Sequence, residues 1–592
     1  MSFVDPRNVA FWLYDWLGAD ALTGHPAYAD HSRETFDAIL ELAEKLAADR
    51  FAPHYKKSDR IEPTLENGVV RVLPEIREAI AAYAEAGLFA ASFAPEHGGL
   101  GLPHVVDAAA MAHFMAANVS TAAFPMLTAG NARVLTKFGS KAQIETFALP
   151  EIEGRTMGTM CLSEPQAGSS LADVMTRAVP DGEDELGPRY RLTGNKMWIS
   201  GGDHDVTPNI IHLVLAKIPD ADGKLPPGTG GITLFIVPKV LPDGTRNDVT
   251  VAGLNHKMGY RGISNCLLNF GERDGAVGWR LGEAGHGLAI MFHMMNEARI
   301  FVGLGAAGLA ARGYRHSLDY ARDRLQGRPA SAKDPAQPQR PIIQHADVKR
   351  MLLAQKAFAE GALSLILFCA HLIDREKVAG DEIERARLSN LLGLLTPIAK
   401  SWPSEFGLAA NDHAIQIHGG YGYTRDFDVE QVYRDNRLNP IHEGTHGIQA
   451  MDLLGRKIIR DKGVSLAALG AEIAQTVADA SAIPALAGQA SRLGEVWQKV
   501  DDTVAVLRAV NADPLANASP FLSAFGHLVV GWLWLDQAVI IFNDTASDRA
   551  FREGKLRACR YFIEAELPKA IPQLELVASL NDAAATMPED SF

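Results

Sequence analysis

Cysteine is scarce in this chain of 592 residues, and basic charge is in deficit. The four cysteines (Cys161, Cys266, Cys369 and Cys559) are widely scattered, and none belongs to a C-x-x-C pair. This spacing argues against a disulfide framework and favours reduced thiols in a cytoplasmic protein. The formal net charge of −14 argues against broad attraction to nucleic acid or anionic lipid. A local basic groove for a phosphorylated ligand remains compatible with that charge.

Long uninterrupted apolar runs are also missing. The N-terminal stretch "MSFVDPRNVAFWLYDWLGAD" has no basic leader followed by a long apolar core, so we expect no signal peptide. The best membrane candidate, residues 525–542, is interrupted by His527 and Asp536. At that length a buried core helix is favoured over a membrane span. With 47% hydrophobic and 22% charged residues, the composition is typical of a soluble globular protein of roughly three or four packed units.

The order of periodic segments predicts an α+β fold. Apolar residues recur at helical spacing from about residue 31 to 155, and we expect an N-terminal helical domain over 1–155. β-rich runs separated by Pro, Gly and Asp turns predict a middle β domain over 156–280. Helical periodicity returns over 281–461, followed by an additional helical extension over 462–592. A Pro-rich segment, 325–341, is expected to be an extended loop. Helices, strands and then helices do not alternate as in a βαβ sheet.

The sequence "HEGTH" at residues 442–446 matches H-E-x-x-H, which on a helix presents two zinc ligands and a general base. No third histidine follows at the zincin spacing, and Gly444 would cost a continuous helix about 1 kcal/mol relative to Ala. Pro440 and Gly444 favour a loop that leads into a helix beginning near Gly447. We therefore predict no metal here. Taken alone, Glu443 would be a carboxylate that caps the first turn of that helix.

Four motifs occur in the order and at the spacing of a known family. The segment 416–449, "QIHGGYGYTRDFDVEQVYRDNRLNPIHEGTHGIQ", resembles the Q-x-x-G-G-x-G and E-G-T signature of acyl-CoA dehydrogenases. The segments "MCLSEPQAGSSL" (160–171), "GNKMWISGG" (194–202) and "APEHGGLGL" (94–102) resemble three further motifs of that family. The resemblance spans roughly residues 75 to 460.

This resemblance implies an FAD enzyme that removes the α-proton and β-hydride of an acyl-CoA thioester, leaving the trans-2-enoyl-CoA. By the match, Glu443 abstracts the α-proton and flavin N5 takes the hydride. An α-C–H is a weak acid, so its base must be desolvated and aimed, and burial raises the basicity of a carboxylate. The thioester oxygen would be stabilised by the backbone N–H of Glu443 and a ribityl hydroxyl. Some relatives carry the base on the earlier helix, which leaves Glu297 as an alternative.

The resemblance also implies the binding residues. Those expected to contact FAD are Met160, Leu162, Ser163, Ser169, Trp198, Ser200, Arg324, Gln416, Gly419, Gly420 and Thr445. Those expected to bind substrate are Ser169, Asn296, Arg299 and Gly444. In the family the Gln416–Gly420 loop is donated to the adenine side across a subunit interface, which implies a homodimer or homotetramer. Trp198 as plain core, and Arg299 and Arg324 as ordinary surface charges, remain the alternatives.

The chain departs from the family pattern at four places. Met160 stands where Tyr or Phe is usual, Ser170 where Asp is usual, and Gly447 where a Gln often contacts the cofactor. The R-x-x-F-G segment is replaced by the Pro-rich loop at 325–341. The resemblance therefore does not extend to the phosphate contacts of that segment.

The length, the N-terminal segment, the Pro-rich insertion and the extension resemble long members of the family that oxidise 3-(methylthio)propanoyl-CoA to 3-(methylthio)acryloyl-CoA in dimethylsulfoniopropionate breakdown. A separate electron-transfer flavoprotein is the expected acceptor. The alternatives are a dehydrogenase or oxidase of another short- or medium-chain acyl-CoA, and a DNA-associated flavoprotein of the alkylation response. The last would need a basic C-terminal surface, and residues 461–592 contain no run of Lys and Arg.

Overall fold

The computed structural model describes residues 3–328, 336–509, 513–544 and 548–592, but not the side chains of 293–297. The chain divides into two compact units. Unit 1 contains Arg33–Pro103 and His113–Ala298. Unit 2 contains the segment up to Ser32, His104–Ala112 and Arg299–Phe592. The division falls inside two long helices, α5 (His104–Phe138) and α8 (Gly287–Asp323).

Unit 1 begins with helices and continues into the sheet. Its α-helices besides parts of α5 and α8 are α2 (Arg33–Leu46), α3 (Tyr55–Arg60), α4 (Pro74–Glu85), α6 (Lys141–Gln143) and α7 (Leu149–Ile152). Pro74 stands in the first turn of α4, where a missing N–H costs nothing. A capping box between Ser140 and Gln143 begins α6. A short hairpin, β1 (Thr64–Glu66) and β2 (Val69–Arg71), precedes α4.

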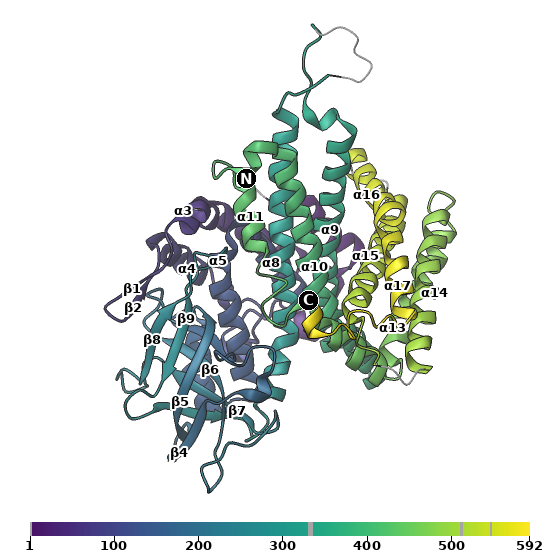
Figure 1. The fold of residues 1–592 in the computed structure, drawn as a ribbon. Helices are drawn as coiled ribbons and strands as arrows, with labels where there is room; N and C mark the ends of the chain where they lie inside the picture. The colour runs from purple at the N-terminus through teal and green to yellow at the C-terminus, as the bar shows by residue number, and fades with distance from the viewer. Residues whose placement is uncertain (1–2, 329–335, 510–512, 545–547) are drawn as a thin grey trace. The chain divides into compact units, whose positions relative to one another are not determined.

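The middle β-sheet follows α7. Its eight strands are β3 (Met157–Cys161), β4 (Arg177–Asp184), β5 (Gly187–Ser200), β6 (Ile210–Lys217), β7 (Ile232–Pro238), β8 (Val249–Leu254), β9 (Asn265–Phe270) and β10 (Ala276–Leu281). They run in the order β10-β7-β6-β4-β5-β9-β8, with β3 parallel to β6. Because β10 pairs with both β7 and β5, the sheet partly closes on itself (Figure 1).

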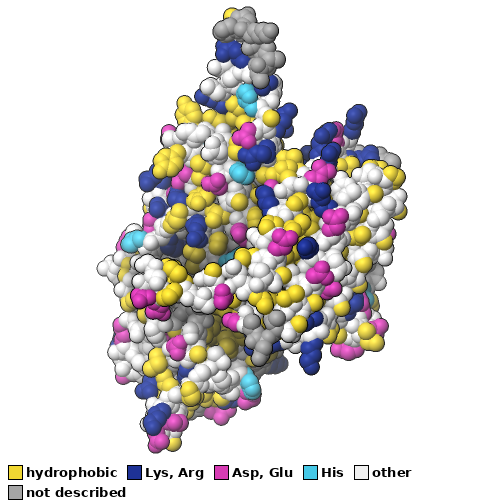
Figure 2. Space-filling view, turned by 45° about the vertical axis from the view of Figure 1, so that its right-hand side comes forward, with side chains coloured by type: hydrophobic (Ala, Val, Ile, Leu, Met, Phe, Trp, Pro, Cys, Tyr) yellow, Lys and Arg dark blue, Asp and Glu magenta, His cyan; other side chains and the backbone are white. Residues whose placement is uncertain are grey.

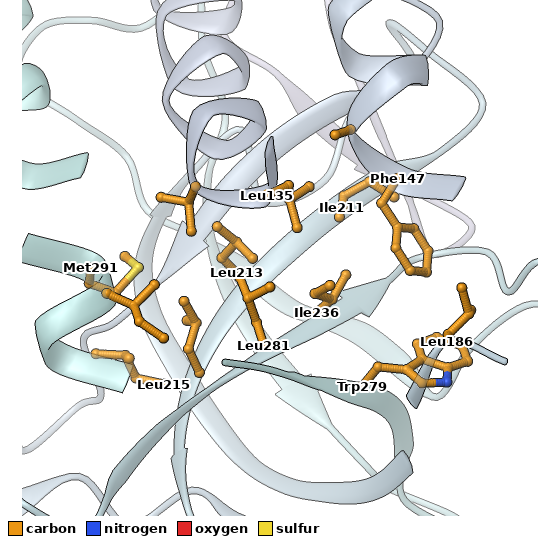
Figure 3. Packing of buried hydrophobic residues seen from close by; sticks show 14 of the residues in the cluster. Leu135, Phe147, Leu186, Ile211, Leu213, Leu215, Ile236, Trp279, Leu281 and Met291 are labelled. Carbon is orange, nitrogen blue, oxygen red and sulfur yellow. The ribbon is translucent and has the colours of Figure 1, made fainter. Parts of the chain in front are cut away.

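The core of unit 1 lies against β6 and β7, in which every residue is buried. Leu213 and Ile236 from these strands pack with Leu281, Leu135 and Phe147, and Figure 3 shows helix and strand side chains meeting in one apolar layer. Strands buried on both faces have nearly continuous apolar sequences, and for this reason the sequences of β6 and β7 predict β structure.

Unit 2 is helical. Its α-helices besides parts of α5 and α8 are α1 (Pro6–Ala10), α9 (Ala346–Val378), α10 (Glu382–His418), α11 (Val429–Asn436), α12 (His446–Met451), α13 (Val464–Ser481), α14 (Ala487–Ala509), α15 (Ala518–Asn543), α16 (Arg549–Tyr561) and α17 (Ala570–Ala578). Helices α9 and α10 lie side by side, and the extension helices α13–α17 pack on one another and on the bundle (Figure 1). The extension therefore shares a packing unit with the bundle.

The start of the chain corrects the predicted N-terminal domain over 1–155. Trp12 Nε1 donates to Gln537 Oε1 at 2.8 Å, and Trp16 Nε1 donates to Asp536 Oδ2 at 2.7 Å. The first residues therefore pack with the extension in unit 2 rather than with the helices that follow them in sequence. An apolar segment rich in tryptophan needs both a large buried surface and acceptors for its indole N–H groups, and α15 supplies both.

Within the described ranges, two helices are long and apolar enough to cross a membrane by length and composition, Ala346–Val378 and Ala518–Asn543. Their most apolar windows are 94% and 78% buried within the protein, as in core helices. In the Pro-rich segment, Leu325 and Pro341 form an antiparallel bridge, and Gln326 N donates to Arg340 O at 3.0 Å. Its described ends are thus paired by an isolated β-bridge, while residues 329–335 lie outside the described part.

Candidate active site

The segment that carries Glu443 is a turn, not a helix. The chain bends over residues 442–444, and α12 begins at His446. Thr445 caps this helix, its side-chain oxygen accepting from Ile448 N at 3.3 Å. The predicted loop leading into a helix near Gly447 is confirmed, with the helix beginning one residue earlier.

The zinc alternative fails on this geometry. His442 lies in the turn, with Nε2 3.1 Å from Asn439 Oδ1. His446 lies in the first turn of α12, with Nε2 3.7 Å from Glu405 Oε2. The two histidines therefore do not share a helix face as H-E-x-x-H requires. Among the described residues, no group of three or more His, Cys, Asp or Glu side chains is arranged to hold a metal ion.

Glu443 has an uncommon backbone conformation. Its φ is +52°, and Gly444 follows with a φ of +86°. A left-handed conformation costs a non-glycine residue about 1–2 kcal/mol, so the surroundings must hold it. Gln449 Nε2 donates to Glu443 O at 2.9 Å, and a Cβ at position 444 would come within 2.5 Å of that same nitrogen. Residue 444 must therefore be glycine if Gln449 is to close the turn.

Burial raises the pKa of the Glu443 carboxyl above its usual value, while Lys400 and Arg299 partly offset this rise. Arg299 is itself buried, and its Nη1 lies 2.6 Å from Asp452 Oδ2. It is thus not an ordinary surface charge, and that alternative is wrong. Its predicted contact with CoA stays a prediction, since its guanidinium is engaged by Asp452 in this structure.

Lys400 is the residue of this site that the motifs did not single out. It lies on α10, is fully buried, and donates through Nζ to Gly444 O and Asn439 O, both at 2.7 Å. Burial lowers the pKa of Lys400 to about 7, and the Glu443 carboxylate opposes that shift. No local pattern in the sequence connects this lysine to the E-G-T turn.

Arg324 and the glycine-rich loop lie together in unit 2. The Arg324 guanidinium carbon is 5.7 Å from the centroid of the Tyr421 ring, directly after Gly419 and Gly420. Both glycines are exposed, as is Gln416 one turn earlier, and the space where a Cβ would stand at either glycine is open. Arg324 is exposed and faces the loop predicted to hold the adenine side. Its contact with pyrophosphate stays a prediction.

In unit 1, Trp198 stands at an irregularity of the sheet. The register between β5 and β9 shifts between Lys196 and Ile199, and Trp198 has a φ of +67°. Its side chain is 59% exposed. Strand irregularities of this kind re-aim a side chain and occur next to active sites. Trp198 is therefore not plain core, and its contact with FAD stays a prediction.

Hydrogen bonds tie the loop after β3 to β5. The side chains that make them belong to the motifs at 160–171 and 194–202, and the resemblance implied no role for them. Lys196, fully buried, donates through Nζ to Leu162 O at 3.0 Å and to Glu164 Oε1 at 2.9 Å. Met197 N donates to Ser163 O at 3.0 Å. The loop that carries Leu162 and Ser163 is thereby fixed beside the strand that carries Trp198.

The other predicted residues are placed as follows. Met160 is half-buried in β3, and Ser169 is exposed in the loop. Ser200 Oγ accepts from Asn265 Nδ2 at 3.3 Å. Asn296 and the alternative base Glu297 lie among the residues whose side chains are not described. The predicted set thus forms two groups. Met160, Leu162, Ser163, Ser169, Trp198 and Ser200 belong to unit 1, and Arg299, Arg324, Gln416, Gly419, Gly420, Glu443, Gly444 and Thr445 belong to unit 2.

Comparison with known proteins identifies the class. The chain matches the acyl-CoA dehydrogenase N-terminal domain over residues 33–155, the middle domain over 159–272 and the C-terminal domain over 285–458. Residues 469–588 match an acetyl-CoA dehydrogenase C-terminal-like domain. The chain belongs to the acyl-CoA dehydrogenase family, and its predicted fold is confirmed. It is an FAD-dependent oxidoreductase that acts on the CH–CH group of an acyl-CoA.

Its relatives extend over the whole chain. It is 36% identical to 3-methylmercaptopropionyl-CoA dehydrogenase of Ruegeria pomeroyi, over 99% of this chain and 100% of that one. It is 33% identical to a butyryl-CoA dehydrogenase of Syntrophomonas wolfei, over 99% and 98%. The solved structure of acyl-CoA dehydrogenase complexed with FAD from Bacillus anthracis is similar in fold, with a TM-score of 0.73 at 22% identity over 96% of this chain and 91% of that one.

The residues present fit FAD. Trp198 offers an exposed aromatic face beside the Ser163 loop, as a flat ring system requires. In unit 2, the exposed Arg324 guanidinium beside Gly419 and Gly420 offers charge and open backbone, as a pyrophosphate requires.

Proposed function

We propose that Glu443 removes the α-proton of a short acyl-CoA thioester, and that 3-methylmercaptopropionyl-CoA is the preferred substrate. The observation that supports the base is the turn itself. A half-buried carboxylate is held in a left-handed conformation whose cost other residues offset. Because backbone strain clusters at active sites, its occurrence at a titratable side chain supports a catalytic role for Glu443.

The chain's residues contribute in distinct ways. Burial of Glu443 raises its pKa, so the carboxylate is a stronger base once the thioester excludes water. Lys400 and Arg299 keep it ionised before the proton arrives at a carboxylate oxygen. The backbone N–H of Glu443 is the proposed donor to the thioester oxygen, where charge develops. When bound, FAD supplies the two-electron oxidant for the β-carbon.

Support for the substrate is similarity along the full length of the chain. The relative from Ruegeria pomeroyi has the same extent and is named for 3-methylmercaptopropionyl-CoA. The Syntrophomonas wolfei relative, nearly as similar, is named for butyryl-CoA. Butyryl-CoA is therefore the second candidate, and differs from the first in lacking a thioether.

The test is anaerobic reduction of the purified yellow protein by each thioester in turn. We expect 3-methylmercaptopropionyl-CoA to bleach the visible band faster than butyryl-CoA, and Glu443→Gln to abolish bleaching by both. Glu472→Gln, which changes a glutamate of α13 paired with Arg387, is the matched control and should bleach normally. Equal rates with both thioesters would reject the substrate preference, and bleaching in Glu443→Gln would reject the base.

The proposal also includes the electron acceptor, the oligomeric state and the location of the enzyme. Electrons leave through a separate electron-transfer flavoprotein, and the enzyme is a cytoplasmic homodimer or homotetramer. The four cysteines are free and buried, as in a reducing compartment. Light scattering gives the oligomeric state. The ratio of dye or flavoprotein reduction to peroxide production separates a dehydrogenase from an oxidase.

A DNA-associated role has less support. On the face in Figure 2, Lys and Arg side chains are interspersed with Asp and Glu rather than gathered into a basic surface. Electrostatic attraction to phosphates requires such a gathering. We expect no salt-dependent retention on immobilised DNA.

A further inference from the structure

Lys400 reaches the Glu443 turn from another helix. Its Nζ donates to two backbone carbonyls that stand on either side of Glu443 in the sequence, Asn439 O and Gly444 O. A single ammonium group thus ties both ends of the turn to α10. Gln449 adds a third tie, from Nε2 to Glu443 O.

These ties offset the backbone strain. A left-handed Glu443 followed by a left-handed Gly444 is stable only if the flanking backbone is fixed. The Gly444 carbonyl that accepts from Lys400 belongs to the Gly444–Thr445 peptide, and the Glu443 carbonyl that accepts from Gln449 belongs to the peptide directly after Glu443. Rotation of either peptide would break one of these hydrogen bonds and re-aim the carboxylate.

Among the side chains that the structure describes, few charges act on Lys400 and Glu443. Glu443 and Arg299 act on Lys400, and Lys400 acts on Glu443 and His446. Arg299 is engaged by Asp452 and His446 faces Glu405. Among the described side chains, Lys400 is a buried cation with no direct hydrogen bond to a carboxylate, so its charge acts on the turn.

We infer that Lys400 is a positioning residue for the proton transfer, which holds the left-handed Glu443 turn and keeps the carboxylate ionised until the α-proton is taken. The inference rests on the proposed role of Glu443. Two contributions follow and are separable. The hydrogen bonds set geometry, and the charge sets the proton affinity of Glu443.

Two variants help to separate these contributions. Lys400→Met removes donor and charge, whereas Lys400→Gln removes the charge and retains an amide donor on a side chain that is one bond shorter. In Lys400→Met we expect kcat for flavin bleaching to fall about 100-fold, as for a displaced catalytic group, with KM changed less than about threefold. In both variants the acid limb of the pH–rate profile should move upward by about 1–3 units, because the opposite charge near Glu443 is gone.

Lys555→Met is the matched control. Lys555 is a buried lysine of α16 in the same unit, paired with Glu360. Its removal should lower the melting temperature but leave the acid limb in place. A Lys400→Met enzyme with wild-type kcat and an unmoved limb would overturn the inference, since Lys400 would then only fill space.

A second measurement does not need activity or a Lys400 variant. At a pH above the raised pKa of Glu443 and below that of Lys400, which is about 7, the Lys400 ammonium faces a carboxylate in the wild type and an amide in Glu443→Gln, so the variant should melt lower. At about pH 9 Lys400 is neutral in the folded protein, and the variant lacks a buried carboxylate charge, so it should melt higher. The melting temperature of the Glu443→Gln holoenzyme minus that of the wild-type holoenzyme should therefore rise with pH, from negative to positive. A difference independent of pH overturns the inference, whereas a wild type that no thioester bleaches overturns the proposed function alone.

Discussion

Lys196 Nζ lies 2.9 Å from Glu164 Oε1, and both side chains are buried in unit 1. Burial raises the pKa of Glu164, but Lys196 and the hydrogen bonds from Thr176 and Met175 more than offset this and leave the pKa below its usual value. The pair ties the loop that carries Leu162 and Ser163 to the strand that carries Trp198. It therefore preserves the geometry of the predicted flavin surface.

Breaking this pair should cost both stability and cofactor. Lys196→Met leaves a buried carboxylate without its partner, which typically costs about 3–5 kcal/mol. We expect a lower melting temperature and a lower ratio of flavin to protein absorbance after gel filtration. Lys141→Met, which removes an exposed pair with Glu145, should change stability by less than about 1 kcal/mol. Full flavin content in Lys196→Met would show that the pair does not shape the site.

Trp198 should be dispensable for folding and needed for flavin retention. The left-handed conformation costs a non-glycine residue such as Trp198 about 1–2 kcal/mol, and Trp198→Gly removes that cost. Glycine loses more entropy on folding, which offsets part of this gain. The melting temperature of the flavin-free protein should thus stay equal or rise, while flavin content falls. Trp198→Phe keeps an aromatic face and should retain more flavin. If Trp198→Gly unfolds instead, the side chain is structural.

The rate of flavin reduction should depend on pH through Glu443. Burial raises the pKa of this carboxyl above 4.5, and only the ionised form accepts the α-proton. The rate should therefore be full above the raised pKa and decline as pH falls through it, in a limb above pH 4.5. Stopped-flow bleaching across pH measures the limb, which Glu472→Gln should leave unchanged. A rate that is flat down to pH 4.5 contradicts the assignment.

The N-terminal segment should stabilise unit 2. Trp12 is 1% exposed and donates to Gln537. Trp12→Ala should cost about 3–5 kcal/mol through lost packing, whereas Trp12→Phe should cost about 1–3 kcal/mol because Gln537 loses its buried donor. Thermal melts and limited proteolysis of the extension measure both. Equal melting temperatures for all three proteins would mean that the segment is detached in solution.

Much of this protein could be predicted from local sequence. The order of helical and β periods predicted the fold, and the E-G-T turn, the Gly-Gly-Tyr-Gly loop and the S-E-P loop predicted the family and the position of Glu443. Proline and glycine decided that "HEGTH" is a turn, because they oppose a helix wherever the chain is placed. Such features depend on residues close in sequence.

Contacts between distant residues were decided only in the tertiary structure. The first residues pack with α15 because their tryptophans found acceptors and apolar surface there, not among their neighbours in sequence. From its sequence alone, Trp198 would be an ordinary strand residue. Its exposure results from the register shift between β5 and β9. Lys400 has the sequence surroundings of a plain helix, and acquires its relation to Glu443 when α10 packs beneath the turn. Desolvation and charge pairing act through space, so the proton affinities of Lys400 and Glu443 exist only in the folded chain.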